Sequence, residues 1–132
     1  YSTNQMPWPF APRELLLYNR LRLDRKRKLL AVEVYSIEDD RYPVAKGNVR
    51  AHMYCGETRV QPAGKGKTRV DLILFVDPKG FIPKWLVNLF QKRLPYNFLQ
   101  ALELKAAATS FPLRPAYREM LDELETMLEA SR

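Results

Sequence analysis

The sequence predicts an α+β fold in which an antiparallel sheet comes first and helices follow. Up to residue 77, four segments alternate apolar and polar residues with the two-residue period of half-buried strands. After a turn at residues 77–80, apolar residues recur with the 3.6-residue period of amphipathic helices. The predicted order is therefore a hairpin, two more strands, a long helix and an acidic helix.

The first two segments form a predicted hairpin. In residues 15–23 four leucines and Asn19 share one face, and tyrosine and arginine side chains share the other. A turn follows at residues 24–28. Residues 29–37 are rich in aliphatic and β-branched side chains, which favours a second strand. Residues 38–47 contain Asp, Pro and Gly and are predicted to form a loop.

The third and fourth strands are expected at residues 48–55 and 68–77. On one face of the third strand lie alternate residues, from Val49 through Ala51 and Met53 to Cys55. Residues 57–62 extend this strand past a bulge expected at Gly56, and a turn follows at residues 62–67. In the fourth strand the apolar face is made by Val70, Leu72, Leu74 and Val76.

Two amphipathic helices are predicted after the strands. The first covers about residues 82–108, with Pro83 at its first position and a kink at Pro95, whose ring removes a backbone hydrogen bond. The second follows a break at residues 111–115 and has five acidic residues opposite an apolar face of Tyr117, Met120, Leu121, Leu124 and Leu128. This apolar face is expected either to pack on an open edge of the sheet or to mediate oligomerisation.

The chain is basic, with a net charge of +7, and its charge is unevenly distributed. Residues 1–113 carry a balance of +9 and residues 114–132 a balance of −2. The densest basic cluster, residues 20–28, is interpreted as a solvated hairpin tip or as a site that docks on anionic lipid head groups. A nucleic-acid-binding module is the rival interpretation. However, only two tyrosines flank the cluster, and the sequence contains no RNA- or DNA-binding motif.

No catalytic or metal-binding constellation is visible. The single histidine, His52, is interpreted as a surface or packing residue, and no HExxH, P-loop or GxGxxG motif occurs. The single cysteine, Cys55, has no ligand partners nearby and is interpreted as a small packing residue. We therefore expect a protein without enzymatic activity, cofactor or metal. No signal peptide and no apolar stretch long enough to span a bilayer are visible.

Three stretches in order resemble the START family, the steroidogenic-acute-regulatory-related lipid-transfer domains. They are PWPFAPRELLLYNRLRL, VRAHMYCGETRVQP and TRVDLILFVDPKGFIPKWLVNLFQKRLPYNFLQAL. The third is the most specific, because it matches the family's strand-to-helix junction, and the first places Arg13 and Glu14 at the family's Arg-Asp pair. The resemblance covers about residues 8–107. It implies a helix-grip fold, similar to the START and Bet v 1 proteins, in which a curved antiparallel sheet wraps around a long C-terminal helix.

The resemblance also implies a function: non-catalytic binding and transfer, or sensing, of one lipid in a tunnel between sheet and helix. A phospholipid, a sterol or a ceramide is the expected ligand, and the expected location is cytoplasmic and peripheral to membranes. The alternative within the fold is an enzyme of the cyclase type. The implied lipid-binding residues are Asn19, Met53, Leu72, Leu74, Leu89, Phe98 and Leu102. From the basic cluster and the position of Trp85 near the helix start, the residues expected to dock on a membrane are Arg25, Lys26, Arg27, Lys28 and Trp85.

Two departures from the family pattern are visible. Asn19 stands where many members have a buried Arg, so its amide is expected either to bond a lipid hydroxyl or to cap a neighbouring backbone group. The N-terminal helices and first strands of the family would precede Tyr1. We therefore expect residues 1–110 to be the C-terminal portion of a START-like domain and residues 111–132 to be an additional acidic helix. The exposed strand edge is expected to pair with a missing N-terminal segment or another copy.

Overall fold

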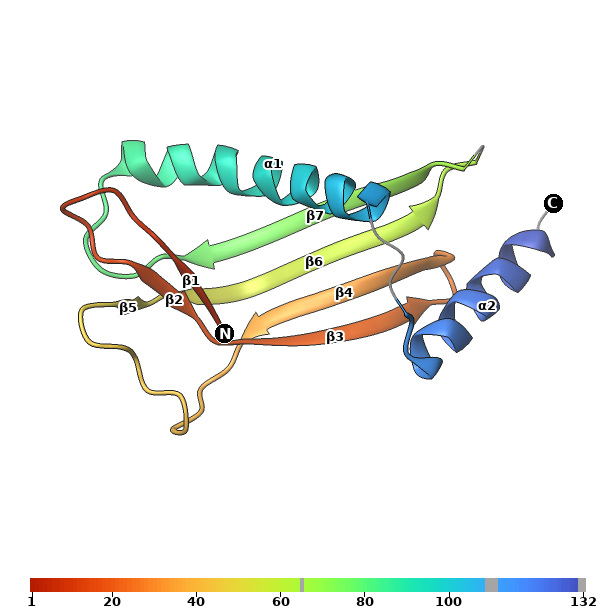
Figure 1. Ribbon diagram of the computed structural model, residues 1–132, viewed down its shortest axis with the longest axis horizontal. Coiled ribbons are helices and arrows are strands. Elements are labelled where there is room, and N and C mark those ends of the chain that lie inside the picture. Colours follow the sequence, from red (N-terminus) through yellow and green to blue (C-terminus); the bar gives the residue numbers. More distant parts are fainter. Residues whose placement is uncertain (65, 109–111, 131–132) are drawn as a thin grey trace.

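The computed structural model describes residues 1–64, 66–108 and 112–130. Strands come first and helices last, which confirms the predicted α+β class (Figure 1). The elements in chain order are β1 (Ser2–Asn4), β2 (Arg13–Leu15), β3 (Leu17–Asp24), β4 (Leu29–Ser36), β5 (Val49–Arg50), β6 (His52–Pro62), β7 (Thr68–Asp77), α1 (Lys84–Ala108) and α2 (Pro115–Glu129).

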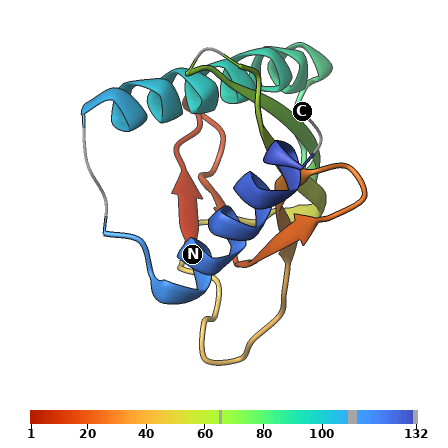
Figure 2. The same cartoon turned by 90° about the vertical axis from the view of Figure 1, so that its right-hand side faces the viewer.

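The principal sheet is antiparallel, with strand order β3, β4, β6, β7. Its register places the leucine-rich face of β3 beside Val34, Gly56 and Leu74 of the successive strands. The sheet curves, and α1 runs along the same side of it as this apolar face (Figures 1 and 2). This arrangement confirms the predicted helix-grip architecture.

A smaller sheet lies toward the end of the molecule where α1 begins (Figure 1). Its strand order is β1, β2, β5. β1 runs antiparallel to β2, and β2 runs parallel to β5. The sequence analysis did not predict this sheet, because strands of two or three residues are too short to show an alternating pattern. Its centre is β2, whose Arg13 and Glu14 are both buried.

The bulge in β6 lies at Tyr54, two residues before the predicted position at Gly56. The extra residue shifts the alternation, so Met53 is buried on the apolar side while Cys55, which pairs with Phe75, is exposed. The interpretation of Cys55 as a packing residue was therefore wrong. Gly56 now faces inward, where Met53 Sδ lies 2.9 Å from the position that a Cβ would occupy.

Both helices differ slightly from their predicted bounds. α1 begins at Lys84, because the carbonyl of Pro83 already accepts hydrogen bonds from the amides of Leu86 (3.0 Å) and Val87 (3.2 Å). It continues through Pro95 as a single helix. α2 packs Leu124 against Leu23 and Leu30, at the end of the sheet where the β3–β4 hairpin turns.

Candidate functional site

A cavity of about 870 Å³ lies between the concave face of the principal sheet and α1. This volume falls within the range of pockets that hold small organic ligands. The cavity begins at β1 and the loop after β7, and it ends near Phe98 on the helix. Most of its surface is apolar, because the sheet and the helix both turn their apolar faces toward it.

Five of the seven predicted lipid-binding residues line this cavity. They are Asn19, Met53, Leu72, Leu74 and Phe98. Leu89 and Leu102, which the sequence analysis placed with them, are outside the lining and are 36% and 38% exposed. Both residues belong to the apolar stripe of α1. This stripe is wider than the cavity, so the sequence pattern does not show which of its residues face the cavity.

The structure adds lining residues that the sequence analysis did not single out. Val34 and Thr58 lie on the same sheet face as the predicted residues, and their register beside Asn19 and Leu72 would have identified them. No pattern in the sequence points to the contribution of the first strand. The additional lining residues are Ser2, Asn4, Met6, Arg13, Leu15, Leu17, Val34, Ala51, Thr58, Phe75, Val76, Pro78, Ile82, Val87, Phe90, Gln91, Leu94, Pro95 and Asn97.

Much of the apolar lining is open to solvent. Leu74 is 40% exposed and Phe98 is 47% exposed, whereas Leu86 is the one residue of α1 in the described chain that is fully buried. Apolar surface left in contact with water costs about 25 cal/mol per Å² relative to burial. A hydrophobic guest between sheet and helix would remove this surface from water.

Two polar side chains stand within the apolar lining of the sheet. Neither the Asn19 amide nor the Thr58 hydroxyl hydrogen-bonds to another side chain or backbone group in the described part of the chain. Asn19 is exposed and Thr58 is half-buried in the cavity wall, so both polar groups are accessible to a polar atom of a ligand. Of the two roles expected for Asn19, the capping of a neighbouring backbone group is therefore not seen among the described residues.

Arg13 fixes the start of α1 to the small sheet. Its Nε donates to the carbonyl of Pro78 (2.9 Å), one terminal nitrogen donates to Lys79 O (3.0 Å), and the other donates to Ala11 O. Burial lowers the pKa of the Arg13 guanidinium. Because the side chain joins the strand at the cavity wall to the loop before α1, it positions one end of the helix over the cavity.

Glu14 organises the loops beside Arg13. Its buried carboxylate accepts hydrogen bonds from the Asn48 amide (2.6 Å), the Tyr1 hydroxyl (2.7 Å) and the Ala45 backbone amide (3.1 Å). Arg50 forms an ion pair with it at 3.4 Å. These donors, the Asn48 bond above all, hold the pKa of the Glu14 carboxyl below its ordinary value.

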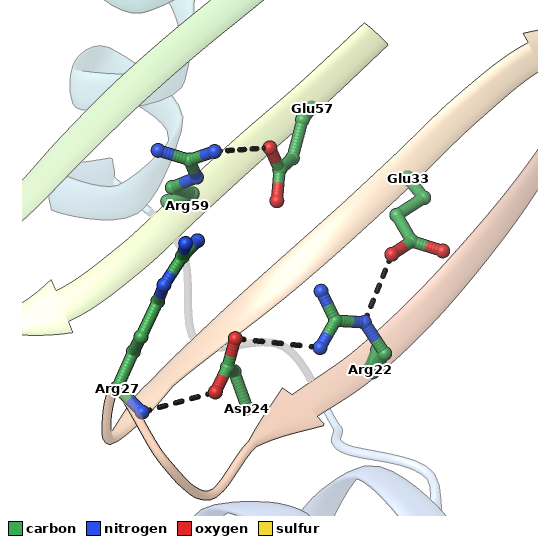
Figure 3. A network of polar contacts seen from close by, with 6 residues as sticks. All are labelled: Arg22, Asp24, Arg27, Glu33, Glu57 and Arg59. Carbon is green, nitrogen blue, oxygen red and sulfur yellow. Dashed lines mark hydrogen bonds and ion pairs between the residues drawn. The ribbon is translucent and has the colours of Figure 1, made fainter. Parts of the chain in front are cut away.

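The basic cluster is partly neutralised on the convex face. Arg22 pairs with Glu33 (2.8 Å) and with Asp24 (3.4 Å), while Asp24 also accepts the backbone N–H of Arg27 (Figure 3). That backbone bond is the main reason why the pKa of Asp24 is lowered. Arg25 pairs with Glu123 of α2. Fewer positive charges are thus available at the hairpin tip than the sequence count indicates.

The predicted docking residues lie at two ends of the molecule. Arg25, Lys26, Arg27 and Lys28 form the β3–β4 turn, whereas Trp85 is at the start of α1, at the opposite end in Figure 1. Trp85 is 62% exposed, and Phe81 and Trp8, in loops at the same end, are 85% and 93% exposed. The structure therefore does not bring Trp85 and the basic residues together on one surface.

Comparison with known protein families identifies the family to which the chain belongs. The family model described as "START domain" matches residues 1–108. The chain belongs to the START domain family. The match ends at the last residue of α1, so α2 lies outside it.

Several known proteins are similar to parts of the chain. An uncharacterized protein of Pseudomonas aeruginosa is 30% identical over 106 residues, which are 80% of this chain and 52% of that protein. The mouse phosphatidylcholine transfer protein is 33% identical over 103 residues, 76% of this chain and 48% of that protein. The chain thus spans about half the length of these relatives.

A solved START structure shares the fold. The crystal structure of human STARD10 matches with a TM-score of 0.63 and 24% identity, over 74% of this chain and 39% of that chain. In the described part of this START chain no helix is long and apolar enough to cross a membrane. The described residues also contain no group of three or more His, Cys, Asp or Glu side chains arranged to hold a metal ion.

Proposed function

We propose that this START chain holds one lipid in the cavity between its sheet and α1, and that it transfers or senses this lipid without reacting with it. The observation that carries the proposal is the cavity of about 870 Å³, whose lining is mainly apolar and partly open to solvent. Burial of a hydrocarbon guest there gives about 0.8 kcal/mol for each methylene removed from water.

A phospholipid is the first candidate, because a phosphatidylcholine transfer protein is among the relatives. Sterols and ceramides are the other candidates that the family suggests. Asn19 and Thr58 would accept or donate a hydrogen bond to a polar atom of the ligand. Native mass spectrometry of the protein purified from cells tests this directly, since a bound lipid adds its own mass. Recovery with no lipid, together with failure to take one up from vesicles, would exclude the proposal.

A matched pair of substitutions tests whether the cavity is the binding site. Leu72 lines the cavity, whereas Ile73, its neighbour in β7, is exposed on the other side of the sheet. Leu72→Trp adds bulk inside the cavity and is expected to reduce lipid uptake about tenfold, the factor for excluding about two methylenes. Ile73→Trp adds similar bulk outside and should leave uptake unchanged. Equal effects of the two changes would place binding elsewhere.

Lipid exchange also requires contact with a membrane, and we propose that both ends of the molecule contribute. Trp85, exposed at the start of α1, is suited to insertion at the lipid interface. Arg25, Lys26, Arg27 and Lys28 would add attraction to anionic head groups, worth about 1 kcal/mol for each basic residue near the surface. Because Arg25 already pairs with Glu123, Lys26 and Arg27 are the better residues to test.

Vesicle co-sedimentation separates the two contributions. Trp85→Ala should weaken binding to neutral and anionic vesicles alike, whereas a Lys26→Ala, Arg27→Ala variant should weaken binding only to anionic vesicles and only at low salt. Tyr96→Ala, at an exposed position further along α1, is the control for loss of an aromatic side chain. Tight, salt-sensitive binding to single-stranded or duplex nucleic acid without vesicle binding would favour the nucleic-acid alternative instead.

A further inference from the structure

Three rows of side chains on the concave face lead from the cavity toward the β3–β4 turn. The register gives first Asn19, Val34, Gly56 and Leu74, then Leu21, Val32, Thr58 and Leu72, then Leu23, Leu30, Val60 and Val70. Residues of the first and second rows line the cavity, but none of the third row does. The cavity therefore ends between the second and the third row.

α2 covers the third row. Leu124 is 3% exposed and forms a buried cluster with Leu23 and Leu30 of that row. Around this cluster pack Leu21 and Val60 from the sheet and Met120, Leu121, Met127 and Leu128 from α2. Figure 2 views the molecule from the hairpin end, with α2 across the front and α1 above it. The helix thus occupies the same face of the sheet as the cavity, directly beyond its end.

An exposed ion pair also joins α2 to the hairpin turn. Arg25 Nε lies 2.5 Å from Glu123 Oε1, and its terminal nitrogen lies 2.9 Å from Glu123 Oε2, a two-pronged contact that defines the direction of both side chains. Glu123 is the residue before Leu124, so the polar contact and the buried apolar contact act at the same turn of the helix. α2 also lies outside residues 1–108, the part that the START family model matches.

We propose that α2 closes the hairpin end of the cavity and limits the length of the hydrocarbon chain that the protein accepts. This inference rests on the proposed function. Neighbouring rows are two residues apart along a strand, which is about 6.7 Å. An extended hydrocarbon chain with bonds of about 1.5 Å covers this distance with roughly five carbons. If α2 contacted the sheet one row nearer to the cavity, the accepted acyl chain would be about five carbons shorter, and with a contact one row farther away it would be about five carbons longer.

Substitution at the buried contact tests the proposal. The full chain would be offered a series of phosphatidylcholines that differ only in acyl-chain length, and the bound species would be measured by native mass spectrometry. Wild type should discriminate against the longest chains. Leu124→Ala opens space over the third row, directly beyond the cavity, and should raise the ratio of long to short chains bound about tenfold, the factor for burying about two further methylenes.

Two further variants make the result decisive. Glu125→Ala changes the next residue, which is exposed, and should leave the length profile unchanged. Leu128→Ala alters a half-buried residue of the same contact and should shift the profile in the same direction even if Leu124→Ala does not fold. Lipid binding with identical length profiles in wild type and a folded contact variant would overturn the role of α2 and leave the proposed function standing. No binding of any lipid by wild type would overturn both.

Discussion

At the scale of single residues, Glu14 links pH to stability. Its folded-state pKa is lowered, so its hydrogen bonds stabilise the fold above the ordinary Glu pKa of about 4.3, and this contribution is lost as the pH falls through the folded-state value. Glu14→Gln should lower the melting temperature at neutral pH, because a neutral amide cannot accept all the bonds from Asn48, Tyr1 and Ala45.

Thermal melts followed by circular dichroism between neutral and acidic pH provide the measurement for Glu14. The difference between wild type and Glu14→Gln should be largest at neutral pH and should shrink below the ordinary pKa. Glu129→Gln, at an exposed position near the end of α2, is the control and should follow wild type. A difference that stays constant into acid would mean that the charge of Glu14 does not contribute.

Gly56 is a second residue whose surroundings predict a measurable effect. A Cβ at this position would lie 2.9 Å from Met53 Sδ and 3.2 Å from Val34 Cβ, both in the cavity wall. Gly56→Ala should therefore displace Met53 into the cavity and cost about 1–3 kcal/mol of unfolding free energy, the usual cost of overpacking. Urea unfolding measures this cost. Gly56→Ala made in a Met53→Ala background, where the crowding sulfur is absent, should cost less than in wild type.

The sequence predicts on which face of the sheet a residue lies where side chains alternate regularly, and the prediction fails where a bulge interrupts the alternation. Asn19, Leu72 and Leu74 lie in uninterrupted strands, and their position on the cavity side could be read from the two-residue period. The bulge at Tyr54 reversed the side of Cys55, and no residue type in that stretch announces the extra position. The role of Arg13 depends on carbonyls 65 and 66 residues away, which a local pattern cannot show.

At the scale of elements, we propose that α1 or a neighbouring loop moves when a lipid enters or leaves. The fully buried anchor of α1 in the described chain is Leu86, near its first turn, and Pro95 lies near its middle and lines the cavity. Pro95 lacks an amide hydrogen, so the helix has a weaker backbone at that point. Pro95→Ala should stiffen α1 and slow lipid exchange between vesicles several-fold, while affinity stays similar.

Stopped-flow transfer of a fluorescent lipid measures the exchange rate. Gln100→Ala, at an exposed position one turn beyond Pro95, controls for a general gain in helix propensity. Unchanged exchange in Pro95→Ala would remove Pro95 as the flexible point of the helix.

The elements themselves were largely predictable, because long strands and helices show their period several times. The hairpin, the fourth strand and both helices appear within a few residues of their expected ranges. The strands β1 and β5 were not predicted, since they consist of three and two residues and exist only through pairing with β2. The contact of α2 with the hairpin end was also not predictable, because an apolar helix face does not identify the surface that it covers.

At the scale of the whole molecule, β7 ends the principal sheet in the described residues. Ile73 and Phe75 on this strand are 43% and 64% exposed, and an unpaired strand edge with apolar side chains favours association. We predict that this chain, produced alone, self-associates through β7. Phe75→Lys should reduce association, since a charge on an edge strand disfavours pairing, whereas Tyr35→Lys on the inner strand β4 should not.

Light scattering coupled to size-exclusion chromatography, over a range of protein concentrations, tests the pairing of β7. A monomer at every concentration would contradict the prediction. Equal effects of Phe75→Lys and Tyr35→Lys would assign association to the convex face instead of the edge.

The proposed lipid site between sheet and α1 would also link the amount of this protein to its ligand supply. A guest that binds only the folded state adds stability, about 2.7 kcal/mol at a concentration one hundred times its dissociation constant. Because Leu86 is the one fully buried residue of α1 in the described chain, the form without a lipid would open more often and be cleaved by proteases sooner than the lipid-bound form. A cell poor in the right lipid would then keep less of the carrier, and its abundance would follow the cargo.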